Sequence, residues 1–86
     1  MAKYDPLFRY LCKADDGPLD MTFDEIERLV GTLPSSATSH RAWWANEVDG
    51  RHVQAAAWLN AGREVATVDP GRRSVRFSAA GWRRGA

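Results

Sequence analysis

Cysteine is almost absent from the sequence, since Cys12 is the only one among 86 residues. A single cysteine excludes an internal disulfide and a zinc site built from cysteine thiolates. On an expected helix beside Phe8 and Leu11, we interpret Cys12 as a small buried hydrophobic residue.

Long apolar runs are also absent. No stretch approaches the roughly 20 apolar residues of a membrane-spanning helix. The opening residues, Met1 to Pro6, lack the apolar core of a signal peptide. We therefore expect a soluble, cytoplasmic protein with no membrane partner.

Side chains suited to catalysis are few. His40 and His52 are the only histidines, and they do not form the HxxxH or HxH spacing that would bring two ligands to one metal. There is no glycine-rich phosphate loop, and Cys12 has no evident histidine partner. We expect neither enzymatic activity nor a bound metal or cofactor.

The charge is nearly neutral overall but unevenly distributed. The net charge is +1, yet residues 1–39 carry four basic and seven acidic groups, whereas residues 40–86 carry eight basic and four acidic groups. All eight basic residues of the second part are arginines. Arginine forms paired hydrogen bonds with phosphate and guanine, so this excess favours an anionic partner. The alternative is that a GC-rich genome raises the arginine content without a functional cause.

The stretch 22–46 has the pattern of a helix, a short turn and a second helix. Thr22 and Glu25 form a capping-box pair that begins the first helix, and Gly31 ends it. After the turn at 32–34, Ser35 or Ser36 can cap the second helix, which closes with two tryptophans.

A helix-turn-helix reads DNA with the N-terminal residues of its second helix. Small hydroxyl residues there allow the backbone to approach phosphates, and a helix N-terminus favours an anion. The DNA contacts predicted from this helix are Ser36, Thr38, Ser39, His40 and Arg41. The alternative is an ordinary pair of short helices in an α+β domain.

A β-hairpin is expected over residues 64–69 and 73–77, because Pro70 and Gly71 between them favour a turn. In winged-helix proteins such a hairpin lies along the DNA backbone or enters a minor groove. The DNA contacts predicted from the hairpin are Arg72, Arg73 and Arg76. The alternative is a solvated turn whose charges prevent edge-to-edge pairing.

Three further elements complete the expected fold. A helix of about ten residues begins at Pro6. A brief edge strand covers 18–21, and an alanine-rich helix covers 52–61. The residues of this last helix expected to face the core are Val53, Ala56 and Ala57, with Leu59 or Trp58. A plain winged helix lacks such an inserted helix between the recognition helix and the hairpin.

Trp43 and Trp44 are adjacent on the second helix, so their side chains point about 100 degrees apart and cannot both be buried against one surface. One ring is expected to pack on the helix that contains Trp58. The other covers the following loop or is exposed, as an anchor for a protein partner or a second copy of the chain.

Five segments carry a resemblance to a known family: YDPL at 4–7, LPSSA at 33–37, HRAWWAN at 40–46, HVQAAAWLNAG at 52–62 and the strand at 65–69. This pattern, which covers nearly the whole chain up to Phe77, resembles a family of small bacterial and phage domains of unknown function. The family usually has an aromatic residue after the last glycine of the fourth segment, where this chain has Arg63. The resemblance implies one compact domain and no particular activity.

These patterns predict an α+β fold, a small winged-helix-like domain over residues 1–77 with four short helices and a C-terminal β-hairpin. A flexible tail is expected over 78–86. The predicted function is binding of duplex DNA, as a small bacterial or phage regulator of transcription or a nucleoid-associated factor. The alternative is a protein interaction module, such as a phage inhibitor or adaptor of a host protein. A homodimer is compatible with either function.

Overall fold

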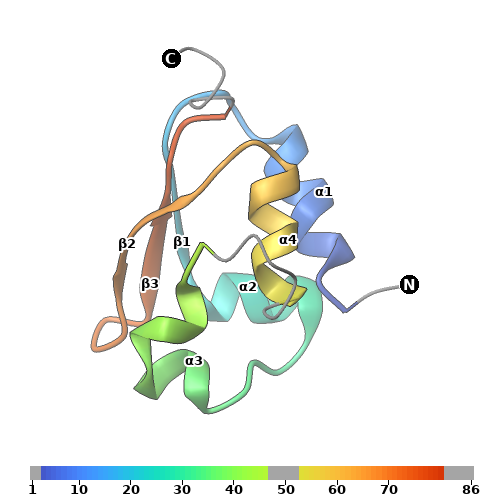
Figure 1. Cartoon of the computed structure of the whole chain (residues 1–86). Helices are drawn as coiled ribbons and strands as arrows, with labels where there is room; N and C mark the ends of the chain where they lie inside the picture. Colours follow the sequence, from blue (N-terminus) through green and yellow to red (C-terminus); the bar gives the residue numbers. More distant parts are fainter. Residues whose placement is uncertain (1–2, 47–52, 81–86) are drawn as a thin grey trace.

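The structure is a computed structural model that describes residues 3–46 and 53–80 (Figure 1). Its elements in chain order are α1 (Asp5–Lys13), β1 (Leu19–Thr22), α2 (Phe23–Val30), α3 (Ser36–Ser39), the 3-10 helix η1 (Arg41–Trp44), α4 (Val53–Asn60), β2 (Val65–Asp69) and β3 (Ser74–Phe77). The predicted α+β class is confirmed.

The sheet is antiparallel and has the strand order β1-β3-β2. β2 and β3 form the hairpin expected from the sequence, and β1 is the expected edge strand. In the register of β1 with β3, Asp20 lies opposite Arg76. Val75 and Phe77 are buried while Arg76 is exposed, as the strand alternation predicts.

The helices α1, α2 and α4 lie on one side of this sheet, and α1 packs against both α2 and α4 (Figure 1). α2 begins with the expected capping box: the Thr22 hydroxyl accepts from the Glu25 main-chain N at 3.0 Å, and the Glu25 carboxylate accepts from the Thr22 main-chain N at 2.8 Å. Gly31 ends α2 with a φ of +88°, a backbone conformation that is strained for any residue with a side chain.

Four aromatic rings run through the core from the helices to the sheet. Trp44 stacks on Phe23 with 4.9 Å between ring centroids and on Trp58 with 5.8 Å, and Trp58 contacts Phe77 at 5.7 Å. Each aromatic pair adds about 0.5–1.5 kcal/mol beyond the burial of area. The expectation that one of the paired tryptophans packs on the helix of Trp58 is therefore confirmed.

Two expectations about burial are wrong. Val53 and Ala56 were expected to face the core, but Val53 is 67% exposed and Ala56 is also exposed. The face of α4 that points into the core is instead the one that carries Gln54 and Trp58. The Gln54 side chain donates to the Trp43 main-chain O at 2.8 Å, which links α4 to η1 in this orientation. Cys12 is exposed rather than buried.

Arg63 is almost completely buried, with 1% of its surface exposed. Its guanidinium donates to four main-chain oxygens, those of Leu11 (3.4 Å), Asp15 (2.6 Å), Gly17 (3.0 Å) and Ser78 (3.1 Å). No carboxylate within the described ranges forms an ion pair with it. Arg63 thus connects the end of α1, the following loop and the residue after β3 through hydrogen bonds.

The folded part extends past the expected boundary at residue 77. The Ser78 main-chain N donates to the Glu64 main-chain O at 2.8 Å, and the Ala80 main-chain N donates to the Asp16 main-chain O at 2.8 Å. The rest of the expected tail, 81–86, lies outside the described residues.

Candidate nucleic-acid interface

The predicted recognition helix is not one continuous helix. α3 ends after four residues, His40 has an extended backbone (φ −131°, ψ 115°), and η1 then follows as a separate turn. The break turns the chain so that Trp44 enters the core, where only 2% of its surface is exposed. Because the helix ends before Arg41, the main-chain O of Ala37 lacks the N–H that a continuous helix would supply, and the Trp44 indole donates to it instead at 2.8 Å.

Two of the three hydroxyl groups of α3 already donate to the backbone at the start of the helix. The Thr38 and Ser39 hydroxyls donate to the Ser35 main-chain O at 2.9 and 3.0 Å. A hydroxyl has one hydrogen to donate, so these bonds would have to break before either group could donate to a phosphate. Ser36 is half-buried, and His40 is exposed. Of the segment 36–41, Arg41 is therefore the residue best placed for a charged ligand.

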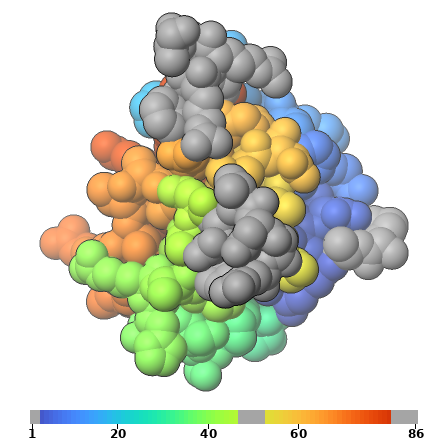
Figure 2. Space-filling view, viewed as in Figure 1, coloured from blue at the N-terminus to red at the C-terminus, as the bar shows by residue number. Residues whose placement is uncertain are grey.

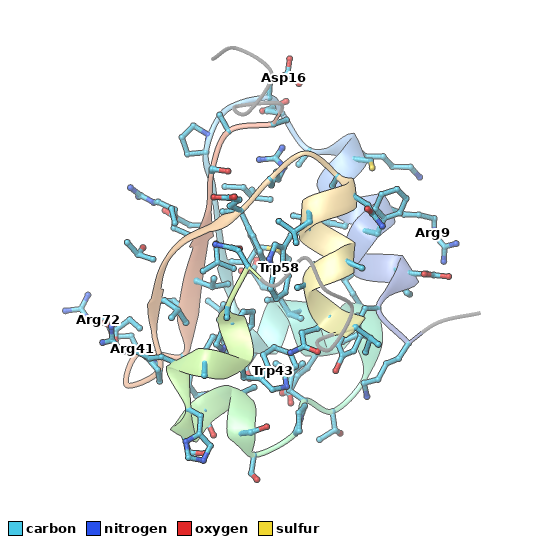
Figure 3. The ribbon with its side chains drawn as sticks, in the orientation of Figure 1. Arg9, Asp16, Arg41, Trp43, Trp58 and Arg72 are labelled. Carbon is cyan, nitrogen blue, oxygen red and sulfur yellow. The ribbon has the colours of Figure 1, made fainter. Side chains whose placement is uncertain are left out.

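Arg41 lies with Arg72 and Arg76 in an open groove of about 580 Å³ between η1 and the hairpin, which we call the arginine groove. Figure 3 shows Arg41 and Arg72 extending to the same side of the molecule, away from α1 and α4. In Figure 2 the green segment of α3 and η1 adjoins the orange hairpin at this edge. The remaining lining residues are Asp20, Asp69, Thr67, Ser74, Val68 and Val75.

Arg76 is held by a paired contact inside the groove. Its Nε and Nη2 donate to the two carboxylate oxygens of Asp20 at 2.6 and 3.0 Å. This hydrogen bond lowers the pKa of Asp20 below its ordinary value, and the nearby positive charge adds to the effect. The same partner raises the pKa of Arg76, which is charged in any case.

Arg72 and Arg41 are less constrained. The Arg72 side chain is 86% exposed, and its Nε lies 3.9 Å from the Asp69 carboxylate, a long contact for an ion pair. The Arg72 main-chain N donates to Asp69 Oδ1 at 3.2 Å, which closes the turn. Arg41 is exposed and forms no ion pair with any residue of the described part.

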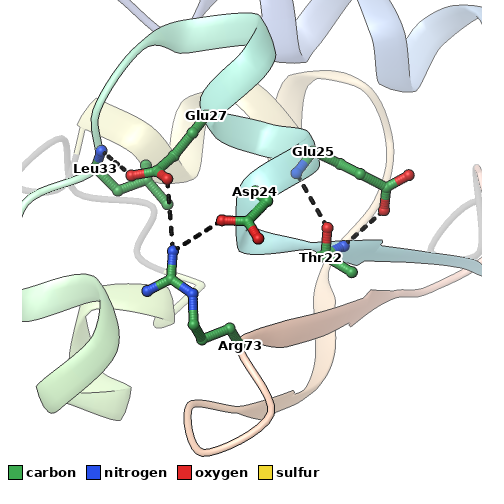
Figure 4. Close-up of polar contacts among 6 residues, drawn as sticks. All are labelled: Thr22, Asp24, Glu25, Glu27, Leu33 and Arg73. Carbon is green, nitrogen blue, oxygen red and sulfur yellow. Dashed lines mark hydrogen bonds and ion pairs between the residues drawn. The ribbon is translucent and has the colours of Figure 1, made fainter.

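Arg73 lies outside the groove, so its predicted place beside Arg72 as a DNA contact is not supported by the geometry. Its Nη2 contacts Asp24 at 3.2 Å and Glu27 at 3.5 Å (Figure 4). Its guanidinium also lies 5.5 Å from the centre of the Phe23 ring. Its backbone has a positive φ of 52°, which turns the side chain back toward α2. Arg73 thus connects the hairpin to α2 and is not placed with the other candidate contacts.

The uneven charge of the sequence is partly neutralised by folding. Arg73 and Arg76 of the basic second part pair with Asp20, Asp24 and Glu27 of the acidic first part. These pairs have no local signal in the sequence because they join residues 46 to 56 positions apart. Only the register of β1 with β3 places Asp20 opposite Arg76.

Neither tryptophan of the pair is a freely exposed anchor. Trp44 is buried, and Trp43 is half-buried with its ring 6.1 Å from Tyr4 and 4.7 Å from Trp44 in edge-to-face contacts. Burial raises the pKa of Tyr4. Trp44 is therefore the ring that packs on the helix of Trp58, and the anchor role remains a prediction for Trp43, whose ring is only partly exposed.

Membrane-spanning helices and metal-ligand clusters are both absent from the described residues. None of the described helices combines the length and apolar character needed to cross a membrane. Over residues 3–46 and 53–80, histidine, cysteine and acidic side chains do not gather in groups of three or more that could hold a metal ion. His52 and the loop before it lie outside these ranges.

Fold and geometry together define a small α+β domain with an arginine-lined groove. Residues 4–80 match the family described as Domain of unknown function (DUF7662), and the chain belongs to this family. The expected membership in a family of unknown function is thereby confirmed. No match was found among curated proteins or among solved structures.

Proposed function

We propose that this domain binds duplex DNA through phosphate contacts in the arginine groove. The observation that carries the proposal is that Arg41, from η1, and Arg72 and Arg76, from the hairpin, line one open groove. Guanidinium groups bind phosphate through two parallel hydrogen bonds, and such contacts supply most of the sequence-independent affinity for DNA. Two of the three, Arg41 and Arg72, are exposed and weakly held, so both are available to a ligand.

The order of elements supports a winged-helix-like arrangement. A helix, an edge strand, further helices and a terminal hairpin follow one another, and the edge strand pairs with the last strand of the hairpin. This is the plan in which a hairpin serves as the wing. In our proposal the hairpin tip with Arg72 is the wing, and η1 with Arg41 takes the place of the predicted recognition helix.

The lining of the groove favours contacts to the DNA backbone over reading of bases. Its described lining side chains are charged, hydroxyl-bearing or aliphatic, and none of them is aromatic. Single-stranded nucleic acids are held mainly by stacking of bases on aromatic rings, so a duplex is the better fit. The described helices beside it, α3 and η1, have only four residues each, too short to read a major groove, which points to weak sequence preference.

The test is fluorescence anisotropy with a short random-sequence duplex at several salt concentrations. Replacing Arg41 and Arg72 together by alanine should lower the affinity by about tenfold or more and reduce the salt slope by about two. Arg9→Ala is the matched control, because Arg9 is an exposed arginine on α1, on the other side of the molecule (Figure 3). Equal binding by the double variant and the control would remove the groove from the proposal.

A second candidate function is docking of a protein partner, favoured by a separate apolar groove of about 360 Å³ between α1 and α4. Phe8 and the exposed Val53 lie along it. Val53→Asp should weaken such docking and leave DNA binding unchanged. A homodimer through this surface would dissociate in the same variant, which sedimentation equilibrium measures.

A further inference from the structure

Two carboxylates lie inside the arginine groove beside two of its three arginines. Asp20 accepts both hydrogen bonds of the Arg76 fork, and Asp69 lies next to Arg72. Both carboxylates belong to the lining of the groove. Three positive charges are therefore offset by two negative ones, and a phosphate entering the groove meets a carboxylate beside two of the three arginines.

The three arginines differ in how readily they can accept a phosphate. Arg41 has no ion-pair partner in the described part of the chain, and Arg72 has only the 3.9 Å contact. Arg76 uses its Nε and Nη2 hydrogens for Asp20, which is the arrangement a phosphate would otherwise adopt. A ligand must therefore break an existing pair, or approach Arg76 from its remaining donors against the charge of Asp20.

We infer that Asp20 and Asp69 act as internal competitors for phosphate and restrict the groove to polymeric phosphate, such as a DNA backbone. The inference rests on the proposed function and names the ligand class of the same groove. A single phosphate ion that displaces Asp20 exchanges one partner of Arg76 for another and gains little. A polymer binds Arg41 first and then presents its next phosphates at a high effective concentration, which favours displacement.

The experiment compares the full chain with Asp20→Asn, Asp20→Asn/Asp69→Asn and the control Asp24→Asn. Asparagine keeps an acceptor oxygen for the Arg76 and Arg72 contacts but removes the charge. Asp24 is the matched control because it is a similarly exposed carboxylate that pairs with Arg73, outside the groove. Melting curves establish that all variants are folded before binding is measured.

Two probes are used, a short duplex and inorganic phosphate. Asp20→Asn should raise duplex affinity about three- to tenfold, while Asp24→Asn should change it less than about twofold, since only Asp20 faces the bound backbone. Inorganic phosphate should shift the arginine side-chain NMR signals of the double variant at concentrations that leave those of the unaltered protein unchanged. Equal gains for Asp20→Asn and Asp24→Asn would overturn the inference, since net charge alone would then explain them. Equal phosphate binding by the unaltered protein and the double variant would overturn it as well.

Failure of the proposed function is distinguishable from failure of this inference. If the unaltered protein does not bind duplex at low salt, the proposed function fails as stated, and the double variant decides the inference. A gain of phosphate binding in that variant supports the competitor role of Asp20 and Asp69. No binding of either probe by either protein overturns both.

Discussion

The indole Nε1 of Trp44 donates to the main-chain O of Ala37 at 2.8 Å, so the buried ring of η1 satisfies a carbonyl at the end of α3. The same ring lies between Phe23 and Trp58 in the core. This one side chain therefore holds the break between the two short helices in place and sets the position from which Arg41 extends.

Trp44→Phe should destabilise the fold more than Trp43→Phe. The change removes the donor to Ala37 and leaves that carbonyl buried without its partner, a loss of about 1–3 kcal/mol before any cavity is counted. Trp43 is half-buried and its indole forms no hydrogen bond within the described residues, so the matched change there should cost less. Urea unfolding measures both, and equal losses would contradict the role given to the Trp44 bond.

Arg63→Met should destabilise the protein by about 3 kcal/mol or more, because four main-chain oxygens lose their shared donor in a buried place. Arg63→Lys should recover part of this loss, since an ammonium has three donors but not the planar fork. The exposed Arg9→Met serves as control. Thermal unfolding measures all three, and an Arg63→Met protein as stable as its control would show that apolar packing replaces the hydrogen bonds.

Thr22→Ala should cost about 1 kcal/mol of stability, because the first turn of α2 loses the hydroxyl that accepts from the Glu25 main-chain N. Thr32→Ala is the control, since Thr32 is an exposed threonine whose hydroxyl forms no hydrogen bond in the described part. Chemical denaturation of the two variants gives the comparison. An equal loss of stability in Thr32→Ala would show that replacing any exposed threonine has this effect and that the capping hydrogen bond does not cause it.

Acid should remove the contribution of the Asp20–Arg76 pair to stability. The hydrogen bond to Arg76 lowers the pKa of Asp20 below its ordinary value of 3.8, so the folded protein holds the ionised form more strongly than the unfolded chain does. The contribution is therefore fully present above about pH 5, declines as the pH falls through 3.8, and is lost below the folded-state pKa.

Asp20→Asn lacks this contribution at every pH. The difference in melting temperature between the unaltered protein and Asp20→Asn should stay constant above about pH 5 and shrink in more acidic solution. High salt should reduce the difference as well, because both side chains are exposed. A difference independent of pH would show that the pair does not stabilise the folded state through charge.

Elements that depend on neighbouring residues could be predicted well. The capping box of Thr22 and Glu25, the end of α2 at Gly31 and the hairpin around Pro70 and Gly71 all follow from contacts within a few residues, which the sequence displays directly. The edge strand β1 was also found, although four residues are a weak pattern. The prediction of one continuous second helix was wrong, because the helix breaks at His40 and the chain turns there so that Trp44 is buried.

The sequence indicated arginines as candidate DNA contacts, but it did not show which of them lie together in the folded protein. Arg41, Arg72 and Arg76 share one groove, whereas Arg73 turns back to α2 and the hydroxyls of Thr38 and Ser39 donate to their own backbone. A positive φ at Arg73 and the rotation of α4 have no local signal, since both result from packing against distant elements.

By itself the sequence determined the fold class, the presence of the hairpin and an excess of arginine in its second part, since composition, turn residues and alternation are local properties. Only the tertiary structure decided which arginines remain available to a ligand. Strand register brought Asp20 to Arg76, and the turn of the chain at His40 brought Arg41 to the hairpin. Pairs of charges far apart in the chain meet only when the sheet and the core have formed, so no local pattern could reveal them.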